Sequence, residues 1–115
     1  PISAWWEADY NMQKQSLELQ KAENNRRDLN EKLLLQMQQA WNDVTESYNQ
    51  TLLAREAIGE ATQNMKVAMD YYHAGMTTVS EVLESQTMLQ QCRDNYVEQV
   101  VQYKIKLTTY LLMVQ

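Results

Sequence analysis

One short segment, residues 72–84, is the only convincing place for a helix to stop and restart in this chain of 115 residues. The segment reads YHAGMTTVSEVLE. Gly75 can take the left-handed backbone conformation that ends a helix, at little steric cost. Thr78, followed three residues later by Glu81, matches a capping box, a pattern that begins a helix. The segment therefore predicts a turn between two helices, with Thr78 as the cap of the second.

The residues on both sides of this turn suit long helices. The whole chain has 2 Gly, 1 Pro and no Phe, and it is rich in Gln, Leu, Glu, Ala and Met. Few breakers and many helix formers indicate an all-α chain. We expect a helix over about residues 4–73 capped by Ser3, a tip at 74–78, and a second helix over about 79–115. The chain would form one segment, 1–115, folded as a long antiparallel hairpin.

Apolar and small residues recur along the first helix at alternating spacings of four and three, which is the pattern of a coiled-coil seam. One row of this seam is small at every seventh position, so that a neighbouring helix can approach closely. The other row supplies the bulk. The seam comprises Leu33, Met37, Ala40, Val44, Ser47, Thr51, Ala54, Ile58, Ala61, Met65, Ala68 and Tyr72.

The second helix repeats the pattern with spacings of three and four. Its predicted seam is Val79, Val82, Gln86, Leu89, Arg93, Tyr96, Val100, Tyr103, Leu107, Tyr110 and Val114. Each helix also carries a further apolar row, which indicates contact with more than one neighbour. On the first helix this row is Leu34, Trp41, Tyr48, Thr62 and Met69, interrupted by Arg55. On the second it is Leu83, Gln90, Val97, Val101, Ile105, Thr108 and Leu112.

The two helices differ in length, so the shorter one covers only about residues 35–73 of the longer. The segment before Leu35 would project alone or contact a piece that is not in this chain. Both ends interrupt the pattern abruptly, and we interpret the chain as part of a larger protein. A two-helix hairpin is thin and buries little per residue, so it needs partners or further copies of itself.

Charge and composition exclude several functions. The net charge of −5 argues against nucleic-acid binding, which requires a basic face. Cys92 is the only cysteine, so an intrachain disulfide is excluded, and no cluster of metal ligands is evident. No apolar run approaches the roughly 18 residues that span a bilayer as a helix. Because the sequence has no nucleophile–base pattern and no phosphate-binding loop, we expect no enzymatic activity and no cofactor.

The tip resembles a known family. The pattern Tyr72-x-x-Gly75-x-x-Thr78-x-x-Glu81-Val82-Leu83-Glu84, continued by Gln86, Leu89, Tyr96, Tyr103 and Leu107, is similar to that of the TolC family of outer-membrane efflux proteins. Pro1-Ile2 resembles the Pro-hydrophobic pair with which those chains leave their β-barrel and enter a long helix. The resemblance covers essentially the whole chain and corresponds to the second of the family's two internal repeats.

This resemblance implies a function. The chain would be one periplasmic helical hairpin of a trimeric channel, a fragment of an α-helical barrel below a β-barrel in a Gram-negative outer membrane. The channel would export drugs, small toxic molecules or proteins. Its partners would be further copies of itself, a periplasmic adaptor protein and an inner-membrane transporter that docks at the tip.

The resemblance also assigns residues at the tip. Glu81 and Glu84 match acidic positions that line the periplasmic aperture, where rings of carboxylates favour cations. The alternative is that Glu81 only caps the helix and that Glu84 is solvated. Tyr72 and Gly75 would contact the gate and the adaptor. Thr77 stands where the best-known member has an arginine that latches the closed entrance, so the same latch is not expected here.

A second class of function stays open at this point. The chain would then be a coiled-coil interaction scaffold, or a periplasmic adaptor hairpin, that pairs with partner helices and transports nothing. Trp5 and Trp6 depart from the family, whose members often carry glycines there. Paired tryptophans suit either a membrane interface, which favours amphipathic rings, or packing on a neighbour.

Overall fold

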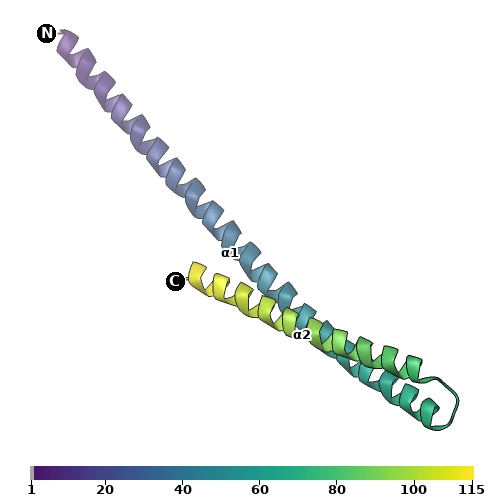
Figure 1. Ribbon diagram of the computed structural model, residues 1–115. Coiled ribbons are helices and arrows are strands. Elements are labelled where there is room, and N and C mark those ends of the chain that lie inside the picture. Colours follow the sequence, from purple (N-terminus) through teal and green to yellow (C-terminus); the bar gives the residue numbers. More distant parts are fainter. Residues whose placement is uncertain (1) are drawn as a thin grey trace. The chain divides into compact units, whose positions relative to one another are not determined.

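Two helices joined by a short turn make up the chain. The computed structural model describes residues 2–115, in which α1 spans Ile2–His73 and α2 spans Val79–Met113. No strand occurs within this range. Figure 1 shows α2 running back beside the later part of α1, in antiparallel orientation. The predicted all-α helical hairpin is therefore confirmed, with its tip where the sequence places it.

The chain divides into two units, and α1 contributes to both. The first unit ends at Gln38 and consists of the early part of α1 alone. Every side chain from Ile2 to Gln36 is exposed. An isolated helix gains no tertiary packing, so the stability of this segment rests on local propensity.

Within the second unit, residues 39–115, two aromatic pairs show how the helices are aligned. The ring centroids of Trp41 and Tyr110 lie 5.2 Å apart, and those of Tyr48 and Tyr103 lie 5.6 Å apart. Both pairs are tilted, an arrangement that aromatic rings prefer to a flat stack. The pairs are seven residues apart on each helix, so the antiparallel alignment is the same at both.

This alignment brings the small row of α1 beside a bulky row of α2. The small row is Ala40, Ser47, Ala54, Ala61 and Ala68. The bulky row is Val82, Leu89, Tyr96, Tyr103 and Tyr110. Extended by heptads from the aromatic pairs, the alignment places Thr62 opposite Leu89, one residue after Ala61. Ala61 and Leu89 are only 9% and 6% exposed. A small side chain beside a large one at each layer lets the two helix axes come close together.

The core of the hairpin follows the seam predicted for α1. Its most buried members there are Val44, Ser47, Thr51, Ala54 and Ala61. Leu33 and Tyr72, at the two ends of the predicted seam, are 44% and 41% exposed. Ser47 and Thr51 are buried hydroxyl residues in this core. The Thr51 hydroxyl donates a hydrogen bond to the carbonyl of Tyr48 at 2.6 Å. No described side-chain polar atom is buried without a partner.

The seam predicted for α2 is wrong near the tip. Gln86 and Arg93 are exposed, and Ser85 and Cys92 are half-buried in their place. Farther along, Val100 and Leu107 are half-buried as predicted. The buried positions of this row are therefore 85 and 92 near the tip and 100 and 107 farther along, which is one residue later in the heptad. A helix that keeps its own 3.6-residue period drifts by about 20° per heptad against a 3.5-residue seam, which produces this change.

The helix ends also differ slightly from the prediction. α1 begins at Ile2, so Ser3 lies inside the helix and does not cap it. Pro1, which belongs to the Pro-hydrophobic pair of the resemblance, lies outside the described residues. α2 ends at Met113, and the backbone N–H of Val114 donates to the carbonyl of Tyr110 at 3.2 Å.

Matched leucines on α2 test the seam. Leu89 is 6% exposed and Leu83 is 55% exposed. We expect Leu89→Ala to lower the free energy of unfolding by about 2 kcal/mol, because it removes buried methyl groups and leaves a cavity. Leu83→Ala should change it by less than about 0.5 kcal/mol. Urea unfolding followed by circular dichroism measures both, and equal effects would contradict the proposed alignment.

Candidate functional site at the hairpin tip

The end of α1 is fixed by backbone hydrogen bonds around Gly75. The N–H of Met76 donates to the carbonyl of Tyr71 at 2.8 Å, and the N–H of Gly75 donates to the carbonyl of Tyr72 at 3.0 Å. Gly75 has a φ of 76°, the left-handed conformation expected from the sequence. This pair of bonds is the Schellman motif, which satisfies the last carbonyls of a helix. The turn is thus built from backbone groups and needs only the glycine.

The start of α2 is fixed by two threonines and one glutamate. Thr78 has extended backbone angles, and its hydroxyl accepts a hydrogen bond from the N–H of Glu81 at 3.4 Å. Thr78 is therefore the N-cap, as predicted. The Glu81 carboxylate accepts a hydrogen bond from the hydroxyl of Thr77. Thr77, which we expected to lack the family's charged latch, holds Glu81 through this local contact.

Glu81 and Glu84 are both exposed on α2. They lie in its first two turns, three residues apart, and therefore point to nearly the same side of the helix. The partially positive N-terminus of α2 is a favourable place for negative charge. Glu84 also borders a shallow hollow of about 500 Å³ on α2, together with Ser80, Leu83, Thr87, Met88 and Gln91.

The remaining tip residues surround the turn without forming a cavity. Tyr72 is 41% exposed, and its ring centroid lies 5.9 Å from that of His73. Met76 is 75% exposed at the end of the turn. Tyr72 and Gly75 are linked through the backbone, and Thr77 is linked to Glu81 through side chains. The structure therefore brings the predicted tip residues together in two local pairs, while Glu84 stands apart from both.

A second hollow lies between the two helices and was not predicted. Small side chains replace the bulky seam on this side, which leaves a space of about 220 Å³. Its lining consists of Ala57, Glu60, Ala61, Asn64, Ser85, Met88 and Cys92. The recurrence of small residues at positions 85 and 92 of α2 is the signal in the sequence that indicates it.

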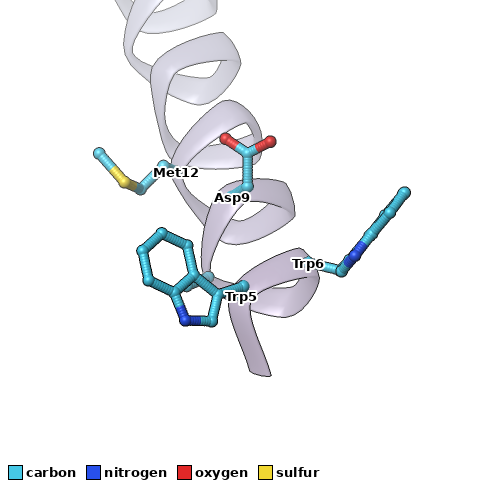
Figure 2. A pocket seen from close by; sticks show the side chains of 5 residues that line it. Trp5, Trp6, Asp9 and Met12 are labelled. Carbon is cyan, nitrogen blue, oxygen red and sulfur yellow. The ribbon is translucent and has the colours of Figure 1, made fainter. Parts of the chain in front are cut away.

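Trp5 and Trp6 lie far from the tip in sequence, in the first unit. Trp5 is 82% exposed and Trp6 is 73% exposed. Figure 2 shows the two indole rings projecting in different directions, with Trp5 on the side of Met12. They border an open hollow of about 560 Å³ with Ala8, Asp9 and Met12. The hollow belongs to a single helix, so its floor is one face of α1.

Further searches of the described residues give no additional site. Within residues 2–115, no group of three or more His, Cys, Asp and Glu side chains is placed to hold a metal ion. Neither α1 nor α2 contains a stretch long and apolar enough to span a bilayer. Comparison with family models, with curated proteins and with solved structures finds no match to this chain.

The two glycines provide an internal test of the turn. A Cβ at Gly75 or at Gly59 would meet no atom within 4 Å, so any effect of alanine comes from the backbone. Gly75→Ala should destabilise the hairpin by about 1 kcal/mol, because a left-handed conformation strains an L-residue. Gly59→Ala should stabilise it by about 0.5–1 kcal/mol, since alanine is the better residue inside a helix. Thermal unfolding measures both signs, and the same sign for both would contradict the turn geometry.

Proposed function

We propose that this chain is one periplasmic tunnel segment of a trimeric outer-membrane efflux duct. One observation supports the proposal most strongly: two exposed carboxylates, Glu81 and Glu84, stand beside the closed end of a long helical hairpin. In a ring of hairpins, copies of these carboxylates would form a negatively charged aperture at the tip. The resemblance of residues 72–84 to the TolC family supports the same placement.

The faces that the hairpin leaves uncovered fit a wall segment. A wall needs neighbours on both sides, and each helix carries apolar residues away from the seam. Examples are Leu53 on α1, 57% exposed, and Ile105 on α2, 53% exposed. In the proposed assembly these residues contact adjacent hairpins. The adaptor and the inner-membrane transporter dock at the tip, where Gly75 and Met76 form the turn.

An interaction scaffold is the second candidate function. The same uncovered apolar faces favour it, since they suit any partner helix with a matching seam. The two candidates differ in what the complete protein contains. A duct requires amphipathic β-strands and a second tip with the Tyr-x-x-Gly spacing, and a scaffold requires neither. Sequencing the complete gene decides between them. A complete protein without amphipathic β-strands would rule out the duct.

The aperture role makes a prediction for the complete trimer. Replacing Glu81 and Glu84 together by Gln removes the charge and retains hydrogen-bond acceptors, so Thr77 keeps a partner. We expect the preference for cations over anions to fall about tenfold in planar bilayer recordings. The control is Glu98→Gln, which neutralises an exposed carboxylate on α2 away from the tip. An unchanged reversal potential in the double variant would contradict the aperture role.

A further inference from the structure

The surface of α2 that points away from its seam is uncovered and partly apolar. Its apolar side chains are well exposed: Val97 is 61%, Val101 is 48% and Ile105 is 53% exposed. We call this surface the outer face. It consists of Gln90, Asp94, Val97, Val101, Ile105, Thr108 and Leu112.

The outer face is symmetric about Val101. Its other members lie four, seven and eleven residues before and after that position. A second α2 that runs antiparallel and crosses at Val101 therefore meets the same spacing. Val101 then faces its own copy and Val97 faces Ile105, so the centre of the contact is apolar.

The polar members of the outer face are compatible with this contact. In the same alignment Asp94 faces Thr108, which is also polar, and Gln90 faces Leu112. The side-chain amide of Gln90 donates a hydrogen bond to the Asp94 carboxylate at 3.1 Å. The Thr108 hydroxyl donates to the carbonyl of Lys104 at 2.8 Å. Each of these groups has one partner within α2, which lowers the cost of bringing a second helix onto them.

The charges along α2 select the antiparallel direction. From Val79 to Glu98 the helix carries four acidic residues and one basic residue. Beyond Glu98 it carries Lys104 and Lys106 and no acidic residue. An antiparallel pair places Glu98 opposite Lys104 on both sides of the axis. A parallel pair would place Glu98 opposite Glu98 and Lys104 opposite Lys104, which is repulsive.

We propose that the outer face of α2 binds a second copy of this chain, antiparallel, with a two-fold axis through Val101. The contact is isologous, because the same surface serves both copies. It uses residues of the second unit only. It concerns the 115-residue chain by itself, because in the proposed duct Ile105 contacts an adjacent hairpin instead. The 115-residue chain is thus expected to dimerise through α2.

A charge exchange tests the alignment. Glu98→Lys and Lys104→Glu each create two repulsive pairs, and each should weaken the dimer about tenfold in sedimentation equilibrium. The double variant Glu98→Lys, Lys104→Glu restores opposite charges and should return the dissociation constant to that of the unchanged chain. If the double variant is as weak as the single ones, the alignment is overturned.

Crosslinking tests the two-fold axis, in chains that carry Cys92→Ser so that one new cysteine is present. Under mild oxidation Val101→Cys should give a disulfide-linked dimer. Gln90→Cys and Leu112→Cys should not crosslink alone, since each lies roughly 33 Å from its own copy at 1.5 Å per residue. A mixture of the two should crosslink. Homodimers of both variants alone would indicate parallel pairing and overturn the proposal.

Two valine variants distinguish this contact from association through another surface of the chain. Val101→Asp should abolish the dimer and leave the helical circular dichroism unchanged, because Val101 is outside the seam. The matched control is Val67→Asp on α1, where the side chain is 41% exposed. The control should dimerise normally. An unchanged chain that stays monomeric throughout the micromolar range, or equal loss in both variants, would overturn the proposal.

Discussion

The pairing of small with large side chains every seven residues is the constraint on which the hairpin depends. Alanine and serine on α1 lie beside valine, leucine and tyrosine on α2, and the two aromatic pairs align the helices. A two-helix structure has no other layer against which to bury a side chain. The few well-buried residues, with Val44 and Ala54 at 4% and Leu89 at 6% exposure, all lie in the seams of the two helices. A shift of one helix along the other by less than a heptad would move the bulky row away from the small one and break both aromatic pairs.

The same constraint explains why so much apolar surface stays open. A seam occupies one side of each helix, and close approach of the helices removes only that side from water. Leu83, at 55% exposure, and Leu89, at 6%, are six residues apart on one helix and differ because only Leu89 points toward α1. Burial of the remaining apolar side chains requires helices from outside the chain, in keeping with the assembly proposed above.

Much of this structure could be predicted from the sequence because its determinants are local. Gly75 is the one glycine at the end of a helical pattern, and Thr78 has the spacing of a cap, so the turn follows from adjacent residues. The seam of α1 follows from an unbroken pattern of three and four. The seam of α2 near the tip did not follow, since Ser85 and Gln86 are neighbours and neither is apolar. Only the alignment with α1 shows that Ser85 and Cys92 face inward. The contact of Thr77 with Glu81 was missed because a capping box predicts that the Glu81 carboxylate accepts a bond from the backbone N–H of Thr78. In the structure it accepts one from the Thr77 hydroxyl.

The tip separates the groups that fold it from the groups available for function. Backbone bonds among Tyr71, Tyr72, Gly75 and Met76 close the turn, and the Thr78 hydroxyl starts α2. Of the two carboxylates, only Glu81 has a partner in this network, and Glu84 contributes no bond to it. The sequence at position 84 is therefore free to vary without loss of the turn. The Glu84 carboxylate therefore takes no part in folding the turn, and its charge is accommodated by the partially positive start of α2. In the proposed function it is free to meet a positive group at the tip, either a permeating cation or a basic partner.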